Sequence, residues 1–251
     1  MLHPELLTFP VPSGTPESLE IGKVAASFQR LLLAGHADEA YAIAVRAHIS
    51  GHSPADLCDD LFRPVMEQIG LNWESGHTAV FEEHLATQTL KRVLGQLRGL
   101  LRPTGDTCPL ALGAAPSGDP YSLPSQMIEW VLSGLGWRAM SFGPDTPLSS
   151  LAKAVATYRP QIVWLSISAP ITQLEPFVAE YHRFQETATR AGSSIIIGGR
   201  SATDELRSRL SFASHGNRIR HLTSFVECLT RRNGSSNGGA IPQSMPVESS
   251  R

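Results

Sequence analysis

The sequence has little of what marks several large classes of protein. Only three of its 251 residues are cysteines, Cys58, Cys108 and Cys228, and they form no CxxC pair. Their number and spacing exclude a disulfide framework and a zinc site, and they fit a reducing cytoplasm. No apolar run approaches ~18 residues, and the N-terminus lacks the pattern of a signal peptide. We therefore expect a soluble, cytoplasmic protein with no membrane association.

An excess of positive charge is also missing. The formal net charge is -2 at pH 7, so no basic surface is predicted and direct binding of nucleic acid is not expected. The sequence contains no Walker A motif, no GxGxxG motif and no HExxH spacing, and no Ser-His-Asp set stands out. Since no acid, base and nucleophile converge, we expect no independent catalytic activity.

Residues 17–101 are predicted to form a helical segment. Apolar residues recur there with helical spacing, and the first two helices end at Gly35 and Gly51. Ser53 is an expected N-cap, followed by Pro54 at the first helical position. Four helices with short connections predict a bundle.

Two further features of this segment are predicted from single residues. Pro64 lies inside the third helix and predicts a kink, because proline has no N–H and clashes with the preceding turn. Thr78 is the expected N-cap of the fourth helix, which should extend from Ala79 to about Leu101.

The periodicity changes after a linker at residues 102–108. Apolar runs predict strands at 109–115, 137–143, 161–168 and 193–199, and helical patterns lie at about 122–135, 147–157, 174–191 and 203–210, with a weaker fifth unit at 219–231. This alternation predicts a parallel, five-stranded α/β domain over residues 109–231. The ends, 1–16 and 232–251, are rich in proline or in glycine and serine, which predicts a disordered leader and tail.

Small and polar residues follow the predicted strands. In parallel α/β folds ligands bind beyond the carboxyl ends of the strands, so these residues form the candidate binding crest. The family resemblance described next singles out these candidates within the crest: Asp119, Tyr121, Ser122, Ser166, Ser168, Gly198 and Gly199.

A helical bundle followed by this α/β domain resembles the cobalamin-binding module of corrinoid proteins, over about residues 19–231. That family carries Asp-x-His-x-x-Gly after the first strand, a short serine segment after the third and Gly-Gly after the fourth. The matching segments here are Asp119-Pro-Tyr121-Ser-Leu-Pro124, Ser166-Ile-Ser168 and Gly198-Gly199. The resemblance implies a four-helix cap, a flavodoxin-like (Rossmann-like) domain, and adenosylcobalamin or methylcobalamin as the cofactor.

The helical segment carries a second resemblance, to cobalamin-dependent photoreceptor regulators. Trp73, Glu83 and His84 match that family's pattern of tryptophan, nine residues, then Glu-His. The resemblance implies that Trp73 packs on the upper face of the cofactor, that the Glu-His pair lies near the upper ligand, and that His84 is a candidate upper ligand of cobalt.

The alternative is that these residues have structural roles. Glu83 projects into a predicted apolar stripe of the fourth helix (Ala86, Leu90, Val93, Leu94, Leu97 and Leu101), with His84 on its flank. A buried carboxylate costs several kcal/mol unless it has a partner, so Glu83 could simply pair with a basic neighbour inside the bundle. Trp73 taken alone could likewise be a core residue.

The sequence departs from the family at the lower face of the cofactor. Where the family has the histidine that binds cobalt from below, this chain has Tyr121, and a phenol with a pKa near ~10 is a poor metal ligand at neutral pH. Pro124 replaces the glycine that lets the backbone approach the nucleotide tail. The resemblance thus implies a degenerate lower site.

Three functions follow from these observations. The first is a cobalamin-binding sensor or regulatory module, with light or ligand exchange as the signal and a partner protein giving the transcriptional output. The second is a corrinoid methyl carrier for methyltransferases, which Tyr121 disfavours. The third is a cofactor-free interaction module on the same fold. Assembly into a homo-oligomer is compatible with each.

Overall fold

The computed structural model of the chain describes residues 20–102 and 104–236. It divides into two compact units, one containing the chain up to Thr104 together with Ser133–Leu135, the other containing Gly105–Leu132 and the chain from Gly136 onwards. The predicted leader, and the predicted tail beyond residue 236, lie outside the described residues. None of the described helices is both long and apolar enough to cross a membrane.

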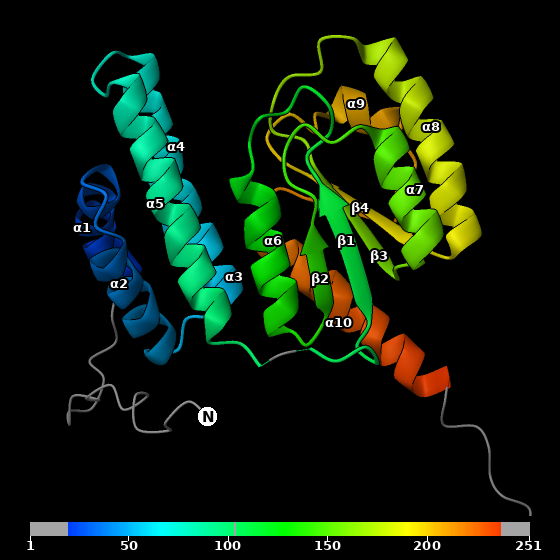
Figure 1. Cartoon of the computed structure of the whole chain (residues 1–251), viewed down its shortest axis with the longest axis horizontal. Helices are drawn as coiled ribbons and strands as arrows, with labels where there is room; N and C mark the ends of the chain where they lie inside the picture. Colours follow the sequence, from blue (N-terminus) through cyan, green and yellow to red (C-terminus); the bar gives the residue numbers. More distant parts are fainter. Residues whose placement is uncertain (1–19, 103, 237–251) are drawn as a thin grey trace, which may run out of the picture. The chain divides into compact units, whose positions relative to one another are not determined.

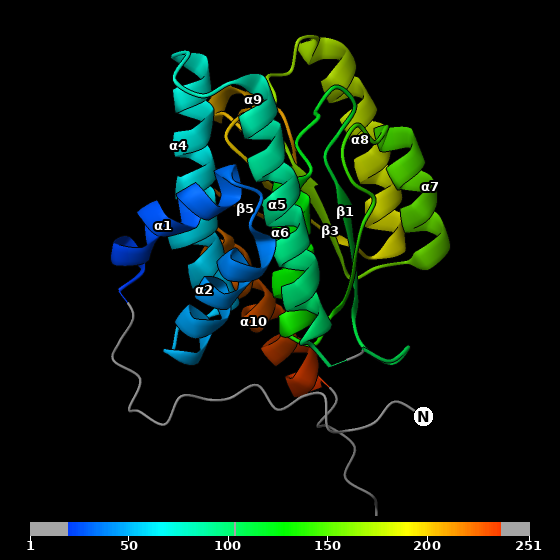
Figure 2. The same cartoon turned by 60° about the vertical axis from the view of Figure 1, so that its left-hand side comes forward.

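The first unit is helical, as predicted. Its elements are α1 (Ile21–Leu33), α2 (Ala37–Ile49), α3 (Pro54–Asp56), the π-helical turn η2 (Leu57–Phe62), α4 (Arg63–Glu74) and α5 (Val80–Gly99). Because α3, η2 and α4 follow one another without a break, the described part of this unit forms four helical rods (Figure 2). The glycines predicted to stop α1 and α2 both adopt positive φ, +76° at Gly35 and +103° at Gly51.

The predicted irregularity at Pro64 takes the form of a π-helical turn. Pro64 is the second residue of α4 and cannot donate a hydrogen bond to the carbonyl of residue 60. The six residues before α4 are wound as η2, which accommodates the missing bond inside an otherwise continuous helix.

The helix N-termini confirm one predicted cap and correct another. Ser53 caps α3, since its hydroxyl accepts from the N–H of Asp56 at 3.1 Å while the Asp56 carboxylate accepts from the N–H of Ser53 at 2.8 Å. Thr78 does not cap α5. The cap is Ala79, whose N–H donates to the carboxylate of Glu82 at 2.7 Å. The glutamate three residues ahead decides the helix start here.

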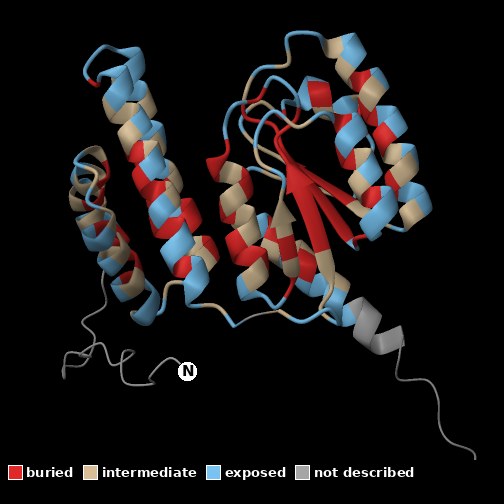
Figure 3. Cartoon of the chain, viewed as in Figure 1, coloured by how far each residue is buried: buried red, intermediate tan, exposed pale blue. Residues whose placement is uncertain are grey.

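The core of the helical unit lies along the predicted stripe of α5. Ala86, Leu90, Val93, Leu94 and Leu97 are buried, whereas Leu101 lies beyond the helix end and is half-buried. Figure 3 shows this burial as a red band along α5. Phe28 and Phe62, both fully buried, stack with ring centroids 5.5 Å apart and join α1 to η2.

The second unit is built on a sheet of five parallel strands in the order β2-β1-β3-β4-β5. The strands are β1 (Leu110–Ala114), β2 (Arg138–Ser141), β3 (Ile162–Ser166), β4 (Ser194–Gly198) and β5 (Ser214–Gly216). The predicted parallel five-stranded domain is therefore confirmed. The three-residue β5 is the element for which the sequence gives no strand signal.

Helices cover both faces of the sheet (Figure 1). They are α6 (Leu123–Gly134), α7 (Leu148–Tyr158), α8 (Leu174–Ala191), α9 (Asp204–Ser208) and α10 (Ile219–Ser236). Helices α7, α8 and α9 pack on one face of β3 and β4, and α6 and α10 pack on the other. Helix α10 continues past residue 231, where the sequence predicts the tail to begin.

Replacing Phe62 with alanine should lower the free energy of unfolding by about 3–5 kcal/mol, because it removes a fully buried aromatic ring from the Phe28 stack. Urea denaturation followed by far-UV circular dichroism measures this. Phe81→Ala is the matched control: Phe81 is 70% exposed in the same unit, so the change should stay within about 0.5 kcal/mol. Equal losses from the two variants would contradict the assignment of Phe62 to the core.

Candidate functional site

The predicted crest residues of the α/β unit are organised around one carboxylate. Asp119, in the loop between β1 and α6, is 2% exposed. Its Oδ1 accepts the N–H of Tyr121 at 3.0 Å, and its Oδ2 accepts the N–H of Ser168 at 2.5 Å and of Ala169 at 3.0 Å. Three backbone donors from two loops therefore satisfy this buried charge, and they fix the β1–α6 and β3–α8 loops to one another.

A second aspartate ties the β2–α7 loop into the same crest. Asp145 Oδ1 accepts the N–H of Gly118 at 2.8 Å, and the N–H of Asp145 donates to the carbonyl of Asp119 at 2.9 Å. Asp145 has a φ of +50°, a region that aspartate tolerates better than most residues.

Tyr121 is presented at the surface of this crest. It is 41% exposed, and the guanidinium carbon of Arg200 lies 4.8 Å from the centroid of its ring. Arg200 itself donates from Nε to the carbonyl of Ser168 at 2.9 Å. Arg200 is not among the site residues predicted from the sequence. Its position directly after Gly198-Gly199 is the signal that could have indicated its place at the crest.

Gly198 and Gly199, at the end of β4, are explained by close backbone contacts within the fold, without any ligand. A Cβ on Gly198 would lie 2.8 Å from the carbonyl oxygen of Gly216 in β5. Gly199 has a φ of +107°, and a Cβ there would lie 2.3 Å from the carbonyl oxygen of Ile167. Strand packing alone therefore demands glycine at both positions.

Ser122 and Ser166, two further predicted site residues, are buried. The Ser166 hydroxyl accepts from that of Ser125 at 3.2 Å, and Ser125 in turn accepts from the indole Nε1 of Trp164 at 3.2 Å. These hydrogen bonds link β3, which carries Trp164 and Ser166, to α6, which carries Ser125. The hydroxyl of Ser166 thus has a partner inside the fold, and ligand contact at Ser166 stays a prediction.

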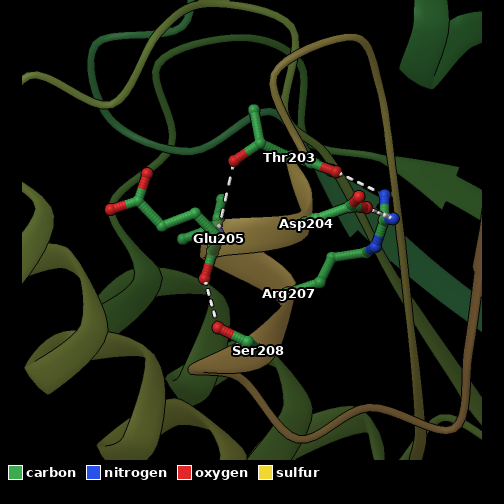
Figure 4. A network of polar contacts seen from close by, with 7 residues as sticks. Thr203, Asp204, Glu205, Arg207 and Ser208 are labelled. Atoms are coloured by element: carbon green, nitrogen blue, oxygen red, sulfur yellow. Dashed lines mark hydrogen bonds and ion pairs between the residues drawn. The ribbon is translucent and has the colours of Figure 1, made fainter.

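The loop that carries Arg200 leads into a well-capped short helix. Thr203 Oγ1 accepts the N–H of Leu206 at 3.2 Å, and the Ser208 hydroxyl donates to the carbonyl of Glu205 at 2.7 Å. Arg207 pairs with Asp204 and donates to the carbonyl of Ala202 at 2.7 Å. Figure 4 shows these contacts along α9; those of Thr203 and Arg207 lie at its start and anchor the C-terminal side of the loop.

The helical unit carries the other predicted residues near the turn between α4 and α5. Trp73 is 45% exposed and is therefore not a core residue. The Glu83 carboxylate accepts from the Thr87 hydroxyl at 3.0 Å and lies 3.7 Å from His84 Nε2. Its side chain is 27% exposed and that of His84 is 72% exposed. Glu83 is thus paired locally and open to solvent rather than buried in the apolar stripe.

Three further apolar side chains, which were not among the predicted site residues, flank the same turn. Leu71, Val80 and Phe81 are each more than half exposed. Such exposure, like that of Trp73, is unusual for large apolar residues. The turn itself is ordered: the N–H groups of His77 and Thr78 both donate to the carbonyl of Asn72, at 2.7 and 3.1 Å. An ordered turn that exposes several large apolar residues is a common feature of binding surfaces.

Among the residues that the structure describes, no group of three or more His, Cys, Asp or Glu side chains is placed to hold a metal ion. The role of His84 as an upper ligand of cobalt stays a prediction.

Residues 24–98 match the family model described as B12 binding domain. This match covers most of the helical unit. The matched residues include Trp73, Glu83 and His84, so the predicted upper-face residues all lie inside the matched segment.

Two curated proteins extend the similarity to both units. The HTH-type transcriptional repressor CarH of Myxococcus xanthus is 29% identical over 156 residues, which is 59% of this chain and 48% of the repressor. The chain thus spans about half the length of that relative. The trimethylamine corrinoid protein of Methanosarcina barkeri is 21% identical over 180 residues, 69% of this chain and 81% of the relative.

A solved structure shows the same fold. The monomethylamine corrinoid protein of Methanosarcina barkeri aligns with a TM-score of 0.65 at 14% identity, over 83% of this chain and 100% of that one. The predicted fold, a helical N-terminal part followed by a Rossmann-like parallel α/β domain, is confirmed.

Asp119→Asn should lower the free energy of unfolding of the α/β unit by about 2–3 kcal/mol, because an amide cannot accept all three backbone bonds and brings a buried donor. Thermal unfolding of the full chain measures the loss. Asp106→Asn is the control, since the Asp106 side chain is 97% exposed and its ion pair with Arg138 should contribute less than about 1 kcal/mol. A neutral Asp119→Asn would refute the anchoring role.

Proposed function

We propose that the chain is a cobalamin-binding regulatory module that contacts its cofactor through Trp73, Glu83 and His84 and acts through a partner protein. The observation that carries this proposal is the exposure of Trp73, near the end of α4, in the unit whose next helix, α5, carries the solvent-accessible Glu83–His84 pair. A tryptophan recruited for the core would be buried, whereas this one is held at a helix end with nearly half of its surface in solvent.

The chemistry of these residues suits the upper face of a corrinoid. The indole offers a large flat apolar surface to a flat macrocycle, and covering it would remove an exposed apolar area from water. Glu83 and His84 add hydrogen-bonding groups that solvent reaches. When bound, an alkylcobalamin supplies a cobalt–carbon bond that light or ligand exchange can break, which is the basis for a sensor.

The lower crest does not fit a cobalt ligand from the protein. Tyr121 offers a phenol in place of an imidazole, and its ring is already covered by Arg200. The Asp119 oxygens, which in the family tune the histidine, are occupied by backbone donors. A methyl carrier that cycles cobalt between oxidation states needs a tuned lower ligand, so that role is the less favoured one.

The same crest favours a second candidate, a cofactor-free interaction module. The retained Asp119, Gly198 and Gly199 are accounted for by packing and backbone hydrogen bonds alone, so they do not argue for a cofactor. In that case the exposed apolar residues around Trp73 would meet a protein partner or a second copy of the chain. Regulation would then depend on assembly and not on a bound corrinoid.

Binding of the cofactor separates these two functions. The full chain is incubated in the dark with adenosylcobalamin or methylcobalamin and passed through a gel-filtration column. We expect corrin absorption to co-elute with the protein in near-equal molar amount. A colourless protein peak with both compounds would favour the interaction module.

Trp73→Ala should weaken corrinoid binding about tenfold or more, since a large aromatic contact face is lost. Equilibrium titration followed by visible absorption measures the dissociation constant. Tyr158→Ala, an exposed aromatic on α7 at 50% exposure, is the control and should leave it unchanged. An unchanged affinity for Trp73→Ala would show that the match at this residue is coincidental.

Tyr121→His, combined with Pro124→Gly, should tighten corrinoid binding and move its spectrum toward the base-off, histidine-ligated form. The natural chain lacks a nitrogen at position 121, so its bound cobalamin should keep its own base or take an outside ligand below. Visible spectra of the two proteins with the same cobalamin provide the comparison. A base-off spectrum already present in the natural chain would overturn the assignment of Tyr121.

A further inference from the structure

Tyr121 and Arg200 belong to a closed ring of contacts. The N–H of Tyr121 donates to Asp119, which accepts the N–H of Ser168, whose carbonyl accepts Nε of Arg200, whose guanidinium lies over the Tyr121 ring. Three loops after three different strands contribute to this ring. Arg200 is therefore held over residue 121 by a hydrogen bond to the backbone, and its place does not depend on the ring contact alone.

The charge of Arg200 is not cancelled by an ion pair. Among the described residues no carboxylate lies within salt-bridge distance of it, and its hydrogen bond uses Nε alone. Asp119 is saturated by three backbone donors, Asp145 accepts from Gly118, and Asp204, in the helix that follows Arg200, pairs with Arg207. A full positive charge thus stands 4.8 Å from the centre of the side chain at position 121.

We propose that Arg200 is a specificity-determining residue that disfavours binding of a corrinoid's metal by a side chain at position 121. This rests on the proposed function, because it concerns the same ligand. A metal bound by residue 121 would bring a second cation close to the guanidinium, and like charges at that separation repel. Tyr121 provides no imidazole nitrogen for the metal, and the positive charge of Arg200 repels a metal at that position. Both residues therefore disfavour a corrinoid whose metal is bound by a side chain of the crest.

This predicts that the single change Tyr121→His is not enough for full ligation. In Tyr121→His the guanidinium should also disfavour protonation of the introduced imidazole, because a nearby cation favours the neutral form. The pKa of that imidazole, followed by NMR in the absence of any corrinoid, should therefore be about half a unit or more higher in Tyr121→His/Arg200→Gln than in Tyr121→His. Tyr121→His/Arg200→Lys keeps the charge and should stay near Tyr121→His.

The second measurement uses cobalamin itself. Tyr121→His/Arg200→Gln should bind it about tenfold more tightly than Tyr121→His, with more of the base-off form in the visible spectrum, and the lysine variant should fall near Tyr121→His. Equal imidazole pKa values and equal affinities with and without Arg200 would overturn the inference. If the pKa values differ as expected but no variant binds cobalamin, the charge effect of Arg200 stands and the proposed cofactor is wrong.

Discussion

The arrangement of the α/β unit depends on the carboxylate of Asp119. A buried negative charge is costly unless donors surround it, and here three backbone N–H groups from two loops do so. This places Tyr121 beside Ser168, and the carbonyl of Ser168 then receives Arg200 from a third loop. The loops after β1, β3 and β4 are joined through two side chains, those of Asp119 and Arg200. Because the three loops are bonded to one another, the residues exposed at the crest are held in fixed relative positions.

This arrangement changes how the family motif is interpreted. Asp119, Gly198 and Gly199 match the corrinoid proteins, yet each is required by hydrogen bonds or close backbone approach within this fold. Such residues persist whether or not a cofactor is bound. The informative positions are those that the fold does not explain: the exposed Trp73 in the helical unit and the Tyr121–Arg200 pair at the crest.

Most of the fold could be predicted from the sequence, because it is encoded in local patterns. The four helical rods and four of the strands follow from apolar periodicity, and Gly35 and Gly51 mark helix ends through their own backbone preference. The start of α5 was wrong by one residue, since Glu82 rather than Thr78 supplies the capping oxygen. The contacts that Arg200 makes and the partner of Ser166 were not predictable. Both depend on contacts between residues 32 to 79 positions apart, which no local pattern encodes.

The exposed residues of the two units differ in chemical character. The helical unit leaves Trp73 and Phe81 in water near an ordered turn, so covering them would be favourable. The crest has already satisfied its own groups: the Asp119 oxygens are occupied, and the Tyr121 ring is covered by a cation. Under the proposed function, the exposed helical residues would contribute binding free energy for a corrinoid, and position 121 would contribute no nitrogen ligand to its cobalt. These properties favour the proposed regulatory role over that of a methyl carrier, whose cobalt needs a tuned lower ligand.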